Sequence, residues 1–519
     1  MVLIPAASSN PVPNRIPPER LPRLCVALEA TQPADLFAKA ERAARDNSLL
    51  ELRLDHLKTP AQALGRLRDF ADSHPAAILI ATCRPTRSGG KFRGSAEAEC
   101  AILSKAAQAG CQWLDLSLPS AERVNANILK KLHLHANLMV SWHDFEGPRY
   151  LHGLAARFAK IPADLYKVAA RARNFADNGR ILRFLAETSA HLPIVAFCMG
   201  EAGLASRILA PHFGSAFTFA SLAPGLATAP GQLDIASMRR IYRVETINRA
   251  TRVYGVLGYP LAHSLSPLML NAAFRRTSVN AVYVPMPTRN PNDVLSQLDA
   301  LDLNGFSVTH PHKSAFLKQL DGIDPMARKI GAINTVVRSS GKLYGYNTDL
   351  AGILVPLEAQ MRIAGARVLV IGAGGAARAA VFGLRERGAS VTILNRTAAK
   401  AHRLAKQARA KVARRRELRK TSFDLIINAT PVGQSPKPQA SPLDAEEINA
   451  PLVFDFVYNP IETSLLRMAR ARGARVISGL EMFVIQGARQ FEIWTGKPAP
   501  RDEMLHEILT YLQQPAATT

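Results

Sequence analysis

Cysteine is scarce in this sequence, with five residues in 519 and no C-x-x-C pair. We therefore expect neither disulfides nor a metal site, but buried free thiols in a reducing compartment, the cytoplasm. Apolar runs long enough to cross a bilayer are also lacking. Residues 1–18 are rich in Pro, Ser and Asn and have no apolar core of a secretory signal. A transit peptide stays open because no acid precedes Glu19, although this segment contains only one arginine.

Acidic residues are few, 41 against 65 lysines and arginines, which gives a formal net charge of +24. This balance suits anionic small molecules as well as nucleic acid. The densest basic run, Lys411–Lys420, has no aromatic side chain for base stacking, so we interpret it as a solvated face near a cofactor. We expect no nucleic-acid or membrane partner, and a monomer or weak oligomer. The length and the 48% hydrophobic content indicate a globular chain of more than one domain.

The most informative stretch is Arg367–Thr397. An apolar run, Val368–Ile371, leads into a glycine turn and an Ala-rich helical segment, and a second apolar run, Val391–Leu394, follows. This order is typical of a dinucleotide site, because glycines let the backbone approach a pyrophosphate and the helix N-terminus offers free N–H groups. The turn residues assigned to the cofactor are Gly372, Ala373, Gly374, Gly375 and Ala376.

The residues that follow the apolar run Val391–Leu394 indicate whether the cofactor is NAD or NADP. An NAD site has an acid there to hold the ribose hydroxyls. This chain has Asn395, Arg396 and Thr397 instead, with Lys400 one helical turn further on. A guanidinium and a hydroxyl suit a 2′-phosphate, so the sequence predicts NADP as the cofactor rather than NAD.

The first half of the chain alternates short apolar runs with Ala/Leu/Arg-rich helical segments. Eight runs in roughly 220 residues are typical of a (β/α)8 TIM barrel, whose chemistry lies at the carboxyl ends of its strands. Polar residues follow that rule in the second to sixth runs, which hold Glu51, Arg53, Asp55, Arg84, Asp115, His143, Asp144 and Lys167. The runs are 24–30, 49–55, 77–84, 113–118, 138–144, 165–170, 194–200 and 217–223.

Lys167 stands out because it lies inside an apolar barrel strand, flanked by Tyr166 and Val168. Burial lowers the pKa of a lysine and frees its amine for Schiff-base formation with a ketone. His143, on the neighbouring strand, is placed to transfer protons for such a lysine. Arg53, Arg84 and Arg207 are then candidate clamps for a carboxylate substrate.

The segments LELRLDH, VSWHDF, DLYKVAA, ASRIL and TAPGQ, in this order, resemble type I 3-dehydroquinate dehydratase. The resemblance implies a Schiff base at Lys167 and acid–base work by His143. It implies substrate contacts from Glu51, Arg53, Arg84, Arg207, Thr228 and Gln232. The family usually has a glutamate that orients the histidine, and Ser88 takes its place here.

A second resemblance begins at Val253. The segments YGVLGYPLAHSLSPLMLNAAF, FSVTHPHKSAF, GAINTVV, YGYNTDLAGI, DLIINATPVG, FDFVYNP and GLEMFVIQGARQF resemble shikimate dehydrogenase. This implies that Lys313 and Asp349 are the catalytic pair, since a Lys–Asp pair can supply a proton beside a carbonyl without a metal. Gly479 is assigned to the cofactor. The implied substrate residues are Ser264, Ser266, Thr309, Asn334, Tyr458 and Gln486.

We therefore interpret the chain as an α/β protein with two enzymes of consecutive steps: dehydration of 3-dehydroquinate to 3-dehydroshikimate, then NADPH-dependent reduction to shikimate. A flexible tail (1–21) precedes the barrel (22–245). A substrate-binding lobe (253–355, completed by 480–512) and a Rossmann NADP lobe (362–479) follow. A catabolic quinate/shikimate dehydrogenase fusion and a non-catalytic metabolite sensor are the alternatives, and retention of the four catalytic residues argues against the sensor.

Overall fold

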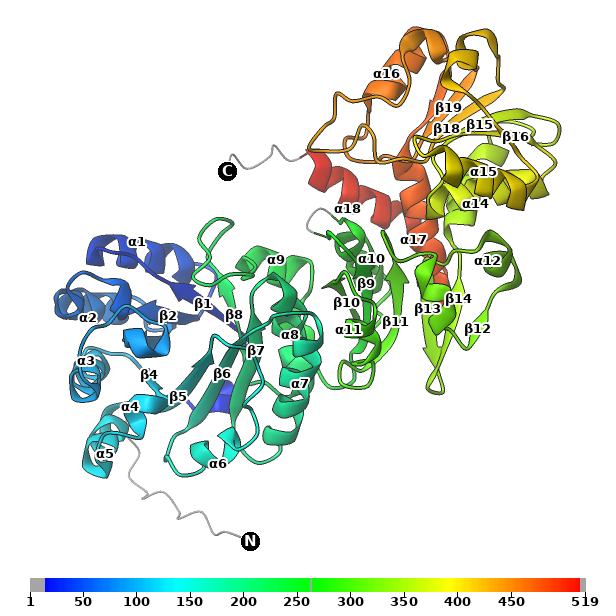
Figure 1. Ribbon diagram of the computed structural model, residues 1–519. Coiled ribbons are helices and arrows are strands. Elements are labelled where there is room, and N and C mark those ends of the chain that lie inside the picture. The colour runs from blue at the N-terminus through cyan, green and yellow to red at the C-terminus, as the bar shows by residue number, and fades with distance from the viewer. Residues whose placement is uncertain (1–14, 262–263, 514–519) are drawn as a thin grey trace. The chain divides into compact units, whose positions relative to one another are not determined.

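The computed structural model describes residues 15–261 and 264–513 (Figure 1). The chain divides into two compact units, residues 1–251 with 292–302, and residues 252–291 with 303–519. Of the expected N-terminal tail, residues 1–14 lie outside the described part. Within residues 15–21, Pro18–Arg20 forms a short 3-10 helix and the Ile16 backbone N–H donates to Asn137 Oδ1 at 3.0 Å.

The first unit contains one eight-stranded sheet in which every pair of neighbouring strands is parallel. The hydrogen-bonded order is β7-β6-β5-β4-β3-β2-β1-β8, and the Ala216 N–H to Ile194 carbonyl bond, 3.0 Å, links the two ends. All eight expected strands are present, so the predicted TIM barrel is confirmed. They are β1 (Leu24–Leu28), β2 (Leu49–Arg53), β3 (Ile78–Thr82), β4 (Trp113–Ser117), β5 (Asn137–Asp144), β6 (Leu165–Arg171), β7 (Ile194–Met199) and β8 (Thr218–Ser221).

Helices cover the outside of this sheet (Figure 1). Their starts are encoded locally: Ser95 and Asn125 each accept a backbone N–H of the first turn, which satisfies donors that a helix end leaves free. Trp113, Met139 and Phe217 belong to a fully buried apolar cluster inside the barrel. The helices are α1 (Pro33–Ala44), α2 (Ala63–Ser73), α3 (Ala96–Gln108), α4 (Leu118–Ala121), α5 (Ala126–His135), α6 (Leu154–Phe158), α7 (Ala176–Thr188), α8 (Leu204–Leu209) and α9 (Ile235–Arg240), and α11 (Asn292–Leu295) belongs to the same unit.

The second unit begins with a mixed six-stranded sheet of order β10-β9-β11-β13-β14-β12. Its strands are β9 (Arg252–Gly258), β10 (Ala281–Pro287), β11 (Leu303–Val308), β12 (Gly322–Ile323), β13 (Thr335–Ser339) and β14 (Lys342–Tyr346). The helix α17 (Gly479–Thr495) returns from far along the sequence to pack here, since Phe483, Phe491 and Trp494 share one core with Tyr254 and Phe274. The other helices are α10 (Ser266–Arg276), α12 (Pro325–Ile330), α13 (Asp349–Glu358) and α18 (Arg501–Gln513).

The same unit holds a parallel sheet of order β17-β16-β15-β18-β19-β20, which is the 3-2-1-4-5-6 order of a dinucleotide-binding fold. The predicted Rossmann unit is thus confirmed. Its strands are β15 (Arg367–Ile371), β16 (Ser390–Leu394), β17 (Lys411–Val412), β18 (Leu425–Asn428), β19 (Leu452–Asp455) and β20 (Arg475–Ile477), with helices α14 (Gly375–Glu386), α15 (Ala398–Ala408) and α16 (Ser464–Ala471). No described helix combines the length and apolarity that a bilayer crossing requires.

Candidate active sites

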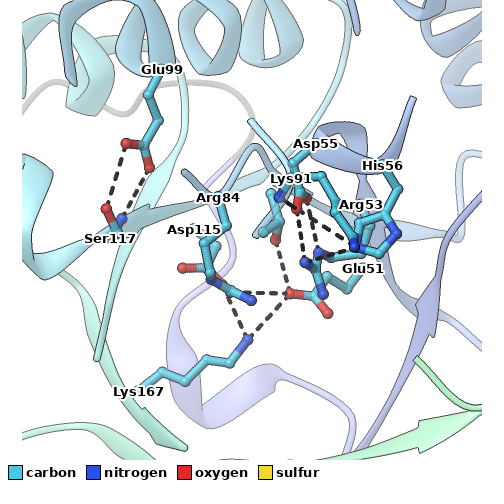
Figure 2. Close-up of polar contacts among 11 residues, drawn as sticks. Glu51, Arg53, Asp55, His56, Arg84, Lys91, Glu99, Asp115, Ser117 and Lys167 are labelled. Carbon is cyan, nitrogen blue, oxygen red and sulfur yellow. Dashed lines mark hydrogen bonds and ion pairs between the residues drawn. The ribbon is translucent and has the colours of Figure 1, made fainter. Parts of the chain in front are cut away.

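The first site is built around Lys167 on β6, which is only 3% exposed to solvent. Its Nζ lies 3.2 Å from Glu51 Oε1 and 3.1 Å from Asp115 Oδ2 (Figure 2). The ammonium also lies 4.1 Å from the centre of the Phe219 ring. β2, β4, β6 and β8 therefore each contribute one of these residues, and the barrel brings together side chains that are far apart in sequence.

Arg84 completes this charge cluster. Its Nη2 lies 2.7 Å from Asp115 Oδ2 and 4.0 Å from Glu51 Oε1, and the Thr82 hydroxyl donates to Glu51 Oε1 at 2.9 Å. Burial by itself would raise the pKa of Asp115, but Lys167 and Arg84 outweigh it and hold that pKa below its usual value. The cluster thus pairs two carboxylates with two cations in a water-poor site.

His143 lies on β5, whose register places it opposite Ala169 of β6. Within the described residues its Nδ1 is buried without a hydrogen-bond partner, as is the hydroxyl of Ser88. Burial, with Arg84 and Lys167 nearby, lowers the pKa of His143 well below its usual value. The imidazole is therefore neutral near pH 7 and can accept a proton.

The other predicted residues of this site differ in their partners. Arg207 is 1% exposed, and its Nε and Nη2 have no hydrogen-bond partner in the described chain. Its guanidinium stacks on Phe197 at 4.3 Å, and burial lowers its pKa to about 10. Arg53 is already engaged, donating from Nε and Nη2 to Asp55 at 2.9 and 2.8 Å.

Thr228 and Gln232 lie on the loop after β8 and bond to each other. The Thr228 N–H and hydroxyl donate to Gln232 Oε1 at 2.8 and 3.1 Å. Among the described residues, no hydrogen bond or ion pair joins these two side chains to the Lys167 cluster.

Asp115 is a functional candidate that the sequence placed among the polar residues of the barrel strands but to which it gave no role. It is 1% exposed and contacts both Lys167 and Arg84. A signal was present, because an acid between Leu114 and Leu116 interrupts an otherwise apolar strand.

The second site is a cavity of about 200 Å³ within the second unit. It brings together all eight catalytic and substrate residues predicted for the dehydrogenase half. They are Ser264, Ser266, Thr309, Lys313, Asn334, Asp349, Tyr458 and Gln486, and Ala376 and Gly479 of the predicted cofactor set also line the cavity.

Lys313 and Asp349 form an ion pair in this cavity, with Lys313 Nζ donating to Asp349 Oδ2. Asn334 Nδ2 donates to Asp349 Oδ1 at 2.8 Å, which fixes the other carboxylate oxygen. Asp349 is the first residue of α13 and is 3% exposed to solvent. A buried carboxylate thus holds the lysine ammonium beside the cavity.

Ser307 and Gln490 also line the cavity and were not predicted. The Ser307 hydroxyl donates to Gln490 Oε1 at 2.9 Å, and Gln490 Nε2 donates to the Asn334 carbonyl at 3.2 Å. They come from β11 and α17, so only the folded chain places them side by side.

The glycine turn borders the same cavity. Gly372 has φ +121°, and a Cβ there would lie 2.9 Å from the Ala429 carbonyl oxygen, so both conformation and space require glycine. A Cβ at Gly375 would lie 2.9 Å from Lys313 Cδ, whereas one at Gly374 would meet no described protein atom within 4 Å. The backbone at Gly374 is therefore open to a ligand at the N-terminus of α14.

The segment that runs from β16 into α15 carries positively charged side chains that have no ion-pair partner among the described residues. Arg396 and Lys400 are exposed, and neither forms an ion pair with any residue the structure describes. Asn395 Nδ2 donates to the Thr397 carbonyl at 2.9 Å and shapes the turn between β16 and α15. Backbone N–H groups at one end and unpaired cations at the other fit a dinucleotide with an extra phosphate.

Four family models match the chain. Residues 24–249 match type I 3-dehydroquinase, and 256–336 match the shikimate dehydrogenase substrate binding domain. Residues 357–450 match shikimate/quinate 5-dehydrogenase, and 479–509 match the shikimate 5′-dehydrogenase C-terminal domain.

Curated relatives match either most of the chain or about half of it. The chain is 37% identical over 477 residues to the chloroplastic bifunctional 3-dehydroquinate dehydratase/shikimate dehydrogenase of Arabidopsis thaliana, covering 88% of this chain and 78% of that protein. It is 44% identical over 271 residues to a shikimate dehydrogenase (NADP(+)) of Methanothermobacter thermautotrophicus, covering 50% of this chain and 96% of that protein. A solved structure of dehydroquinate dehydratase and shikimate dehydrogenase from S. pombe is 24% identical, covers 94% of this chain and 98% of that chain, and has a TM-score of 0.43.

Proposed function

The chain belongs to the bifunctional 3-dehydroquinate dehydratase/shikimate dehydrogenase family, and from this premise we propose the residues that carry each reaction. The barrel dehydrates 3-dehydroquinate to 3-dehydroshikimate, and the second unit reduces that product to shikimate with NADPH. The observation that carries the proposal is the position of Lys167, buried between Glu51 and Asp115 inside the barrel. The sensor and the catabolic fusion are not favoured.

In the dehydratase, Lys167 loses a proton and its neutral amine attacks the substrate ketone, forming an imine as water leaves. The imine is positively charged when protonated, and Glu51 and Asp115 stabilise that charge at close range. His143 removes a proton from the carbon next to the imine and returns a proton to the departing hydroxyl, which leaves as water. Water then hydrolyses the imine and restores the Lys167 amine.

Arg207 is the proposed partner of the substrate carboxylate. Its two unpartnered nitrogens are buried donors, and a buried cation without a counter-ion is costly. A carboxylate would supply both acceptors at once. Thr228 and Gln232, on the loop after β8, are proposed to close over the substrate from the other side.

In the dehydrogenase, NADPH supplies the hydride. Lys313 and Asp349 hold the substrate beside it, and Lys313 gives a proton to the carbonyl oxygen as the alcohol forms. Asn334 and Gln486 orient the pair and the substrate hydroxyls, because Asn334 Nδ2 donates to both Asp349 Oδ1 and, at 3.4 Å, Gln486 Oε1. Ser264, Ser266, Thr309 and Tyr458 complete the proposed substrate contacts.

The joint activity has a direct test. Purified protein given 3-dehydroquinate and NADPH should consume the cofactor, followed by its absorbance, and yield shikimate, identified by mass and chromatography. Omitting NADPH should leave 3-dehydroshikimate as the end product. Cofactor loss only when 3-dehydroshikimate is supplied would contradict the proposed role of the barrel.

Cofactor choice should depend on Arg396. A charge-assisted contact to a 2′-phosphate contributes roughly 1.5–3 kcal/mol, or one to two decades of affinity. NADPH should therefore exceed NADH in kcat/KM by at least about tenfold. Arg396→Ala should remove most of this preference through a higher KM for NADPH with little change in kcat, because the phosphate is remote from the hydride.

A matched control is Arg470→Ala, which removes another exposed arginine of the same fold, one paired with Glu462. It should leave both cofactor constants unchanged. Equal use of NADPH and NADH by the unmodified protein would overturn the role of Arg396.

We also propose a cytoplasmic location. The five cysteines are buried and unpaired, which suits a reducing compartment.

A further inference from the structure

Glu99 is a buried acid that the proposed reaction does not use. It lies on α3, outside the barrel strands, and is 0% exposed. Figure 2 shows its carboxylate turned toward Ser117, beside the Lys167 cluster. A carboxylate in such a place is costly unless it is well hydrogen-bonded, so its contacts indicate what it stabilises.

The carboxylate of Glu99 accepts donors from the end of β4. The Ser117 backbone N–H donates to Oε1 at 3.2 Å, and the Ser117 hydroxyl lies 3.5 Å from Oε2. The Ser120 hydroxyl also donates to Oε2. Glu99 therefore fixes both the backbone and the side chain at the point where β4 passes into α4.

The same carboxylate connects to the segment after β3. Arg87 Nη2 lies 3.9 Å from Glu99 Oε2 and donates to the Ser120 hydroxyl at 2.7 Å. Arg87 lies on the 3-10 helix Thr86–Ser88, three residues beyond Arg84. Glu99 thus ties together the ends of β3 and β4.

Arg84 and Asp115 lie close to these two strand ends, Arg84 two residues beyond β3 and Asp115 within β4. Asp115 is two residues before Ser117 on β4, and one of its oxygens touches both Lys167 and Arg84. A shift of Ser117 would change the distance from Asp115 to Lys167, because only Leu116 separates Ser117 from Asp115 on β4.

We propose that Glu99 is a positioning residue of the dehydratase: its contacts hold the end of β4, and with it Asp115, in place against Lys167, and protonation of Glu99 loosens this hold. The inference rests on the role proposed for Lys167. When ionised, both oxygens of Glu99 accept donors. When Oε2 is protonated it becomes a donor, so the Ser120 hydroxyl can no longer donate to it and must rotate, which changes the hydrogen bonds that Ser120 shares with Ser117 and Arg87.

Burial raises the pKa of Glu99 to about 7, and its bonds with Ser120 and Ser117 lower it only partly. The charged groups that face it are Asp115, which raises this pKa, and Arg87, which lowers it. Cys83 also interacts electrostatically with Glu99, but burial raises the pKa of this thiol far enough to keep it neutral. The protonation state of Glu99 therefore changes within the physiological range.

The test compares Glu99→Gln, Glu99→Leu and Glu97→Gln, measuring the ratio of dehydratase to dehydrogenase activity between about pH 5.5 and 8.5. Because both activities are measured on the same preparation, their ratio does not depend on how much of each variant is folded. Glutamine copies the neutral acid, so this variant should lose the rise in activity through about pH 7 and fall roughly tenfold below the unmodified protein at the upper end. Leucine, which accepts no hydrogen bond, should lower the ratio at every pH. Glu97, on the same helix but exposed, should have no effect.

A wild-type pH profile in Glu99→Gln would overturn the proposal, as would an equal effect of Glu97→Gln. The premise is tested separately: borohydride with 3-dehydroquinate should add mass at Lys167 in the unmodified protein. Failure of that labelling refutes the role of Lys167, whereas failure of the pH change refutes only the role of Glu99.

Discussion

Replacing Lys167 with alanine should abolish dehydratase activity, by at least about a thousandfold, while the dehydrogenase reaction stays near its normal rate. The amine is the only group of the site that can form an imine with the substrate, and neither Glu51 nor Asp115 can replace it. The variant also removes one of the two cations that Glu51 and Asp115 share and leaves them with Arg84. The measurement is formation of 3-dehydroshikimate, with the dehydrogenase activity of the same preparation as the internal standard.

A matched control is Lys160→Ala, which removes an exposed lysine seven residues earlier. It should retain full dehydratase activity. In the unmodified protein, borohydride reduction in the presence of substrate should inactivate the enzyme and label the peptide that holds Lys167. Substantial dehydratase activity in Lys167→Ala, or a label on another peptide, would contradict the assignment.

Lys313→Ala should have the opposite effect, with loss of dehydrogenase activity and retention of dehydratase activity. Dehydrogenase activity should fall by about a hundredfold or more, because the substrate carbonyl loses its proton donor and Asp349 keeps a buried charge without a counter-ion. Dehydratase activity should remain nearly intact, since the two sites share no described residue. The assays are oxidation of shikimate by NADP and dehydration of 3-dehydroquinate.

Lys318→Ala is the control for this experiment, because Lys318 is exposed on the neighbouring 3-10 helix Ala315–Gln319. Both of its activities should match those of the unmodified protein. A large loss of both reactions in Lys313→Ala would show that the two sites depend on each other.

The barrel and the Rossmann unit were predictable because their patterns are local. Each barrel strand is one apolar run bounded by a helical segment, and the turn at Gly372 combines a strand, a positive φ and a helix start within a few residues. Lys167 could be singled out for the same reason, as a charge within one such run. The resemblances then supplied roles that periodicity alone does not give.

The contacts that tune the sites were not predictable, because they join residues from different strands and helices. Asp115 meets Arg84 only through the register of β3 with β4, in which Thr82 lies opposite Asp115. A hydrogen bond joins Glu99 on α3 to Ser117 on β4, and another joins Ser307 to Gln490, which are 183 residues apart in sequence. A single sequence without its fold contains no signal for such pairs.

Gly375 has a consequence for protein engineering. A single added carbon at this position would collide with the side chain of Lys313, so the cofactor turn and the proton donor are fitted to each other at the scale of one methyl group. Recombining this Rossmann module with the substrate lobe of another dehydrogenase would therefore succeed only with donors that keep both residues compatible. Cofactor exchange is better attempted at Arg396 and Lys400, whose side chains are exposed, than by transplanting the glycine turn.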